Sequence, residues 1–106
     1  MRKAKILRLH FSESNRYGDK PLYEAIVQKC FEMNIAGATV FRGLEGFGES
    51  SEIHRHHLVG REQPIVVVIA EAAERISELI PVLEQMMDTG MIAISDVEMI
   101  RVQHGA

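Results

Sequence analysis

The run Pro64–Ala70 (PIVVVIA) restricts the fold of this chain more than any other stretch, because every one of its residues is apolar. Successive side chains of a β-strand point to opposite faces, so this strand has two apolar faces. A strand with one wet face alternates apolar and polar residues instead. We therefore expect a central strand with one face under helices and the other face against further protein.

Three other segments have the composition of β-strands. Lys5–Phe11 alternates between two faces, Ala38–Leu44 is rich in β-branched and aromatic residues, and Val97–Gln103 forms the last strand pattern. The polar segment Ser12–Pro21 is a connection. Its Asp19 is the predicted N-cap of the helix that follows.

Two segments have the three- and four-residue spacing of apolar side chains that is typical of amphipathic helices. The first helix ends near Asn34, and its apolar stripe consists of Leu22, Tyr23, Ile26, Val27, Cys30 and Phe31. The stripe of the second consists of Ile76, Leu79, Ile80, Leu83, Met86 and Met87. Pro81 removes a backbone hydrogen bond from the second helix, so we expect a kink or two pieces there. Gly90 ends that helix.

The resulting order of elements, βαββαβ, predicts an α+β fold of the ferredoxin-like kind. Right-handed crossovers place both helices on one face of an antiparallel sheet, with the first and third strands at its centre. We expect residues 1–106 to form one domain of this fold. The other face of the sheet then predicts self-association. The alternative is a monomer whose long loop covers that face.

Composition excludes several classes of protein. Lys and Arg number 12 against 15 Asp and Glu, and the net charge of −3 argues against a nucleic-acid-binding protein. The N-terminal segment lacks the apolar core of a signal peptide, and no apolar run is long enough to cross a membrane. The one cysteine cannot form an internal disulfide. We expect a cytoplasmic protein without direct membrane insertion.

Residues 45–63 (EGFGESSEIHRHHLVGREQ) form a long irregular segment, and loops of this length are more often functional than idle. Gly43, Gly46 and Gly48 lie at its start, without the order or the following helix of a dinucleotide fingerprint. They indicate either a sharp exit from the strand or close approach of the backbone to a ligand. Arg42, just before the loop, and Arg101, on the last strand, are candidates for ligand binding or for salt bridges between subunits.

Histidines in the same loop are the candidate metal ligands. In an extended chain His54 and His56 point the same way, so they suit one divalent ion, whereas His57 points away. The alternative is that all three are solvated loop residues. Cys30 lies in the apolar stripe of the first helix and is expected to be an unreactive core thiol.

Three stretches resemble a known family: Leu22–Val27 (LYEAIV), Ala36–Leu44 (AGATVFRGL) and Glu45–His54 (EGFGESSEIH). They are similar to the PII-like family catalogued as domain of unknown function 190. The wider PII group has a similar glycine-phenylalanine-glycine turn, here Gly46, Phe47 and Gly48. The resemblance implies a homotrimer, nucleotide-type ligands between subunits, and a loop that reports the ligand to a partner.

The sequence departs from the PII pattern at two places. Glu49 stands where PII proteins typically have a basic residue after the glycine turn. PII proteins also hold phosphates with a glycine- and lysine-bearing loop before the last strand, whereas Asp88–Asp96 here has one glycine and no Lys or Arg. Arg42 and Arg101 are therefore the remaining cationic candidates for an anionic ligand.

These observations predict a PII-like regulatory trimer and not an enzyme. A small anionic effector, of the adenine-nucleotide type, would bind at subunit junctions. Arg42 and Arg101 would supply charge, while Gly43, Gly46, Phe47 and Gly48 would form the loop base around it. The loop 45–63 would present a surface to a protein partner. The alternative is a metal-responsive trimer similar to CutA, with a divalent metal on His54 and His56.

Overall fold

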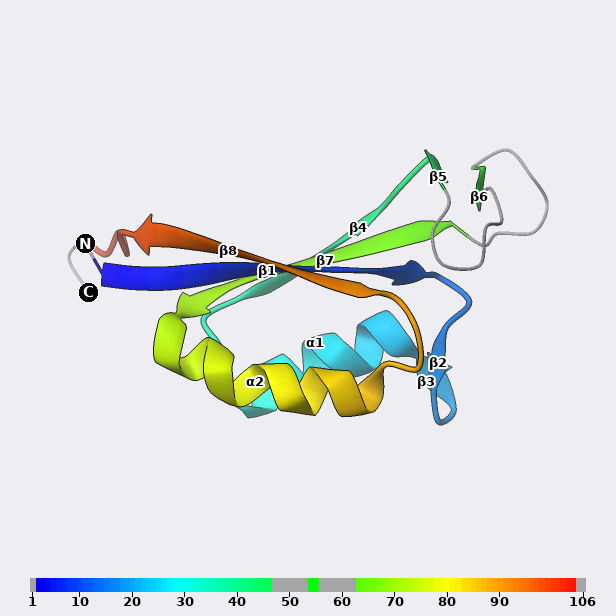
Figure 1. Ribbon diagram of the computed structural model, residues 1–106, viewed down its shortest axis with the longest axis horizontal. Coiled ribbons are helices and arrows are strands. Elements are labelled where there is room, and N and C mark those ends of the chain that lie inside the picture. The colour runs from blue at the N-terminus through cyan, green and yellow to red at the C-terminus, as the bar shows by residue number, and fades with distance from the viewer. Residues whose placement is uncertain (1, 47–53, 56–62, 105–106) are drawn as a thin grey trace.

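The computed structural model describes residues 2–46, 54–55 and 63–104. Four antiparallel strands form a sheet with two helices on one of its faces (Figure 1). Across the sheet, the strands are β4 (Ala38–Arg42), β7 (Pro64–Ala72), β1 (Arg2–Ser12) and β8 (Met91–Met99). The helices are α1 (Leu22–Glu32) and α2 (Ala73–Met86). This arrangement confirms the α+β, ferredoxin-like βαββαβ fold, with the first and third predicted strands at its centre.

Two pairs of very short strands lie outside the main sheet. β2 (Arg16–Tyr17) and β3 (Lys20–Pro21) form a hairpin in the predicted connection. Gly18, between them, has a φ of 63°, which favours glycine. β5 (Glu45–Gly46) and β6 (His54–Arg55) pair within the long loop.

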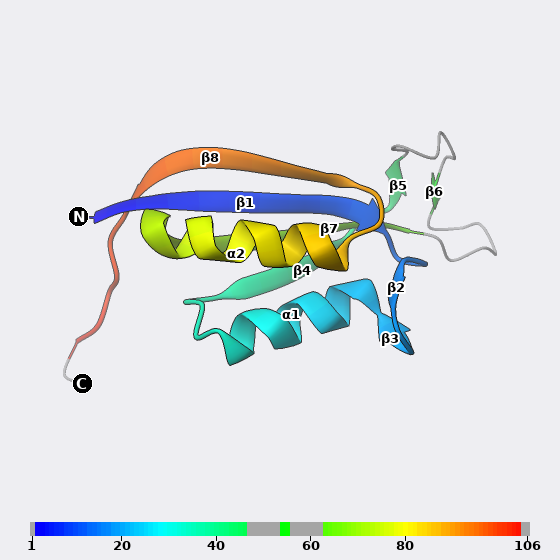
Figure 2. The same cartoon turned by 60° about the horizontal axis from the view of Figure 1, so that its bottom comes forward.

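The hydrophobic core lies between the sheet and the two helices (Figures 1 and 2). β1 and β7 supply alternate residues to it, as their two-residue period requires. The helices close the core with the three- and four-residue spacing of an apolar stripe. Its fully buried residues are Leu7, Leu9, Ile26, Val67, Ile69, Ile76, Leu79 and Leu83, each with an exposed fraction of 0%.

The observed strand bounds differ from the predicted ones in both directions. β1 and β7 are both longer than predicted, because they pair with each other from Ala4 to Ser12. β4 ends at Arg42, two residues before the predicted Leu44. The prediction for the last strand is wrong in position, because β8 spans Met91–Met99 and lies opposite β1. Residues 100–104 lie beyond the end of β1 and are not part of a strand.

Two local predictions about α1 are wrong. Asp19 does not cap α1: Pro21 is the N-cap residue and makes no side-chain cap bond, and the amide of Leu22 instead donates to the carbonyl of Asn15. Phe31 is 76% exposed, because it lies beside Cys30 but outside the face that packs on the sheet. The predicted end of this helix near Asn34 is confirmed, because α1 ends at Glu32, Met33 is its C-cap residue and Asn34 follows with a φ of 60°.

α2 ends at Met86, four residues before the predicted stop at Gly90, and it continues without a break through Pro81. It is therefore one helix and not two pieces. Proline removes one backbone hydrogen bond, but Leu79 and Leu83 on either side of it are fully buried. Their burial holds the helix on the sheet across the missing bond.

The second face of the sheet is also mainly apolar. Val66 and Val68 of β7 point to this face, because their neighbours in the strand point into the core. Phe41 on β4 and Met91 on β8 lie on the same face and are 56% and 54% exposed. The sequence expectation of a strand with two apolar faces is therefore confirmed.

Neither α1 nor α2, the two helices of the described residues, has the length and apolar character of a membrane-spanning segment.

Candidate functional site at the base of the long loop

Four segments that are far apart in the sequence meet at one end of the sheet, which we call the loop-base end. They are residues 11–13, 42–46, 63–65 and 87–91. The strand register brings them together: Phe11 lies opposite Ile65, Ile65 lies opposite Arg42, and His10 lies opposite Met91. Figure 2 shows the start and the end of the long loop, beside β5 and β7, at this end of the sheet.

Arg42 is the last residue of β4, and its guanidinium is already paired. Nη2 donates to a carboxylate oxygen of Glu13 at 2.5 Å. The hydrogen bond and the charge of Glu13 raise the pKa of Arg42 above its ordinary value, with a smaller contribution from Tyr23 on α1. The Arg42 side chain is 49% exposed, so solvent screens the pair. An anion that binds Arg42 must therefore share it with Glu13 or displace Glu13.

Main-chain hydrogen bonds hold both arms of the loop at this end. The amide of Gly43 donates to the carbonyl of Pro64 at 2.7 Å, and the amide of Glu13 donates to the carbonyl of Gln63 at 2.8 Å. A Cβ on Gly43 would lie only 2.8 Å from Cγ of Pro64. This glycine therefore allows the start and the end of the loop to pack against each other. Of the two interpretations of the glycines given above, Gly43 fits the sharp exit from the strand.

Gly46 has a different environment from Gly43. It belongs to β5 and pairs with His54 of β6, so these two short strands lie side by side within the loop. A Cβ on Gly46 would lie 3.4 Å from Pro64, which is an ordinary contact distance. Phe47 and Gly48, the other two residues of the predicted loop base, lie outside the described residues.

The turn between α2 and β8 closes the loop-base end from the other side of β1. Gly90 has a φ of 118°, an angle that residues other than glycine rarely adopt. A Cβ there would lie 2.4 Å from the carbonyl oxygen of His10. The residues compared above with the PII phosphate loop, Asp88–Asp96, are therefore this tight turn followed by six residues of β8.

Arg101 lies at the opposite end of the sheet from Arg42. It follows Met99, whose partner is Arg2 at the start of β1, whereas Arg42 lies level with the end of β1. Nine strand residues at about 3.3 Å each separate these levels by about 30 Å. One chain therefore does not bring the two predicted cationic residues together.

The metal prediction falls mostly beyond the described residues. The backbone of His54 belongs to β6, while His56 and His57 lie outside the described residues. In the part of the chain that the structure describes, no group of three His, Cys, Asp or Glu side chains is arranged to hold a metal ion. Cys30 is 2% exposed, which confirms its predicted place in the core. Burial raises its pKa to about 11, which disfavours the reactive thiolate.

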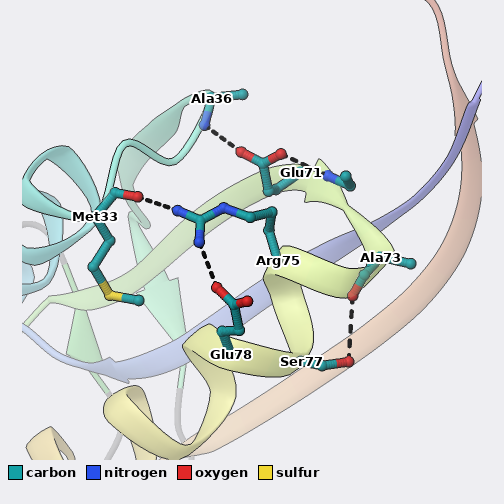
Figure 3. Close-up of polar contacts among 8 residues, drawn as sticks. Met33, Ala36, Glu71, Ala73, Arg75, Ser77 and Glu78 are labelled. Atoms are coloured by element: carbon teal, nitrogen blue, oxygen red, sulfur yellow. Dashed lines mark hydrogen bonds and ion pairs between the residues drawn. The ribbon is translucent and has the colours of Figure 1, made fainter.

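Sequence reasoning missed a second polar cluster, at the other end of the sheet (Figure 3). Glu71 is 8% exposed, and its two carboxylate oxygens accept hydrogen bonds from the amides of Ala36 at 2.6 Å and Ala72 at 2.8 Å. Arg75 donates to the carbonyl of Met33 and to Glu78. We call these contacts the Glu71 cluster, and they join the α1–β4 connection to the start of α2. The signal in the sequence was the acidic residue directly after the apolar run Pro64–Ala70.

Comparison with known families identifies the chain. A family model described as "Uncharacterized ACR", domain of unknown function 190, matches residues 4–99. The chain belongs to this family. The resemblance expected from the sequence is therefore confirmed. A UPF0166 protein of Aquifex aeolicus is 34% identical over 100 residues, which cover 92% of this chain and 94% of the relative. A UPF0166 protein of Methanocaldococcus jannaschii is 29% identical over 101 residues, which cover 91% of each.

Solved structures resemble this member of the domain 190 family in fold. One is CPII, a nitrogen regulatory PII-like protein from Thiomonas intermedia, bound to ADP, AMP and bicarbonate. Its TM-score is 0.67 at 17% identity, over 93% of this chain and 90% of CPII. Another is the divalent ion tolerance protein CutA1 from Ehrlichia chaffeensis. Its TM-score is 0.62 at 12% identity, over 98% of this chain and 88% of that one. At these identities the likeness shows a shared fold.

Proposed function

We propose that this protein is a PII-like regulatory homotrimer that binds a small anionic effector, of the adenine-nucleotide type, at its subunit junctions. The observation that carries the proposal is the convergence of Arg42, both arms of the loop and the α2–β8 turn at one end of the sheet. The same fold in CPII is described with bound ADP, AMP and bicarbonate. The proposal assigns regulation to the protein and no catalytic step.

The trimer is proposed from the second face of the sheet. Phe41 lies beside Val66 of β7 and Met91 lies beside His10 of β1, and both side chains are more than half exposed on this face. Packing this face against other copies removes apolar area from water, which is the main driving force for association. The trimer also gives Arg101 a role, because the two arginines are far apart in one chain. We assign Arg101 of one copy to the loop-base end of the next.

The loop would report the effector through the Arg42–Glu13 pair. A phosphate that binds Arg42 replaces Glu13 as the partner of the guanidinium, because both ligands use the same donors. Glu13 is held beside the end of the loop, because its backbone N–H donates a hydrogen bond to the carbonyl of Gln63. Release of its carboxylate therefore changes the support of the loop 45–63, which would present one surface to a protein partner in one ligand state. Gly43, Gly46, Phe47 and Gly48 would line the base of this loop.

Calorimetric titration of the purified protein with AMP, ADP, ATP and cyclic AMP, with and without magnesium, tests the proposal. We expect one nucleotide per chain, and a loss of binding in both Arg42→Gln and Arg101→Gln. Mixing these two variants restores part of the binding if one site takes Arg42 and Arg101 from different copies. Lys20→Gln is the matched control, because Lys20 belongs to the β2–β3 hairpin. Unchanged affinity in both arginine variants, or no nucleotide binding, would reject the proposal.

A metal-responsive protein is the second candidate, and the observation in its favour is the fold shared with the divalent ion tolerance protein CutA1. In that case His54 and His56 would hold a divalent ion. The variant with both histidines replaced by alanine would lose the stabilisation by zinc, copper or nickel in thermal unfolding. Its response to adenine nucleotides would stay the same. The opposite pattern, metal stabilisation that survives both substitutions, removes the histidine site.

A further inference from the structure

The middle of the second face of the sheet carries two basic side chains among apolar ones. Side chains on this face alternate with the core residues of each strand. In the middle of the sheet, from β4 to β8, they are Thr39, Phe41, Val66, Val68, Ala70, Ile6, Arg8, His10, Met91, Ala93 and Ser95. We call this set the open face. Arg8 and His10 stand on its central strand β1, with Val68 and Val66 beside them.

Among the residues that the structure describes, Arg8 has one hydrogen-bond partner on this face, and that partner is neutral. Its Nη1 donates to the hydroxyl of Ser95 at 3.3 Å. None of the strand residues that form the open face carries a carboxylate. Phe41 and Met91, which are more than half exposed, also lie on the open face. In the proposed trimer, other copies of the chain cover this face. Association therefore brings Arg8 and His10 of each copy into a region with little water.

Cations that are buried together need a counter-charge. Like charges repel strongly where the dielectric constant is low, and a buried charge without a partner is costly. The open face supplies the apolar area for association but not the acid that would neutralise Arg8. A trimer formed through this face therefore requires an anion from solution.

We propose that the trimer holds one small oxyanion between the three copies of Arg8 and His10. This inference rests on the proposed trimer, and the site is incomplete in a single chain. A guanidinium presents a planar pair of donors that matches two oxygens of phosphate, sulfate or bicarbonate. His10 lies two residues along β1 from Arg8, about 7 Å away on the same face, and adds a ring N–H donor. The ligand class is a tetrahedral or trigonal oxyanion without an organic part.

The stoichiometry of binding tests this site directly. Titration of the full chain with inorganic phosphate, sulfate and bicarbonate, against chloride at equal ionic strength, should give one anion for every three chains. An anion at about 100 times its Kd should raise the unfolding temperature by several degrees. The three anions differ in shape and charge, so their ranking identifies the physiological one. One anion per chain would contradict the proposal.

Substitution of Arg8 gives the second test. In Arg8→Gln the stabilisation by oxyanions should disappear. Without oxyanions, this variant should associate more tightly than the wild type, because the repulsion between the arginines is gone. Lys3→Gln is the matched control, because Lys3 is an exposed cation on the same strand whose position alternates with that of Arg8, so it belongs to the other face. An equal loss in both variants, or none in Arg8→Gln, overturns the site.

The same variants separate this inference from the proposed effector site. Arg8→Gln should still bind nucleotide, because Arg8 is not part of the loop-base end. Arg101→Gln should still bind the oxyanion. A chain that is monomeric at all concentrations in analytical ultracentrifugation would reject the oxyanion site and the trimer together. A trimer that binds nucleotide but no oxyanion would reject the oxyanion site alone.

Discussion

The two ends of the sheet are held by polar contacts of different kinds. At one end, buried Glu71 accepts hydrogen bonds from two main-chain amides, and Arg75 donates to a main-chain carbonyl (Figure 3). At the loop-base end, Arg42 and Glu13 pair through their side chains, and solvent reaches both. The first cluster fixes backbone to backbone, whereas the second joins two side chains that can change partners.

This difference indicates which end is suited to a ligand. When a buried carboxylate gives up a hydrogen bond from a main-chain amide, that amide has neither water nor another protein group as acceptor. The hydrogen bonds of such a carboxylate therefore exchange slowly and at a high cost in free energy. An exposed ion pair contributes little to stability, and its guanidinium accepts a new anion with little loss. The end that carries the long loop is therefore the end whose polar contact is exchangeable.

We expect the largest effect from Glu71→Gln, which removes one of the two hydrogen bonds that Glu71 accepts from main-chain amides. The variant amide keeps the size of the side chain but turns a donor toward one of the two amides. We expect a loss of about 2 kcal/mol in the free energy of unfolding, the range for a buried donor left without an acceptor. Urea unfolding measures it. Glu74→Gln is the control, because the carboxylate of Glu74 is 74% exposed and 3.6 Å from Arg2. Equal effects of the two substitutions would refute the contrast.

Arg75→Gln should have a smaller effect at the same end. The guanidinium donates to the carbonyl of Met33, the C-cap residue of α1, and its side chain is 34% exposed. Loss of this contact should cost about 1 kcal/mol in unfolding free energy. It should also increase amide hydrogen exchange near Asn34 and Ile35, because the α1–β4 connection loses one of its two attachments. Exchange that rises equally at the loop-base end would contradict this assignment.

At the loop-base end, the Arg42–Glu13 pair should contribute less than about 1 kcal/mol. A double-mutant cycle of Arg42→Gln and Glu13→Gln measures the coupling energy. We expect it to disappear in about 1 M salt, where screening acts over roughly 3 Å. The Glu71→Gln effect should remain in the same salt, since both of its hydrogen bonds are buried or half-buried. A coupling energy that is independent of salt would show that the pair is not exchangeable.

The smallest effect is the pH dependence of another exposed pair, Lys5 and Asp96, with an N–O distance of 2.5 Å. The hydrogen bond from Lys5, and then its charge, lower the pKa of Asp96 below the ordinary value of 3.8. Because the pKa of Asp96 is lower in the folded than in the unfolded protein, the pair stabilises the fold fully at pH values above 3.8. This stabilisation is lost as the pH falls through the pKa of the folded protein. The difference in stability between wild type and Asp96→Asn should therefore vanish at low pH. Asp88→Asn, an exposed aspartate of the α2–β8 turn, is the control.

Local patterns in the sequence were sufficient for most of the fold. The two helical stripes and the doubly apolar strand Pro64–Ala70 predicted the layers and the strand order, because burial of apolar faces has a fixed period. The wrong predictions concern residues whose position depends on one local contact. Phe31 fits the apolar composition but not the buried side of α1. Asp19 is a good N-cap residue, yet the hairpin places Pro21 at that position instead.

The candidate site could be predicted only in part. The glycines and Arg42 mark the start of a long loop in the sequence, but the pairing of Arg42 with Glu13 joins residues 29 positions apart. Glu71 and Ala36 are 35 positions apart. No spacing rule relates such residues, because their distance depends on the register of β7 against β1 and β4.

By itself, the sequence determined the α+β class, the order of the elements, the apolar second face and the family. These follow from side-chain periods and from local motifs that each segment carries alone. Only the tertiary structure decided that Arg42 is paired, that Arg101 lies at the far end of the sheet, and that Arg8 lies between Val68 and Ala93. These depend on strand register, which is fixed when the core closes between the sheet and its two helices.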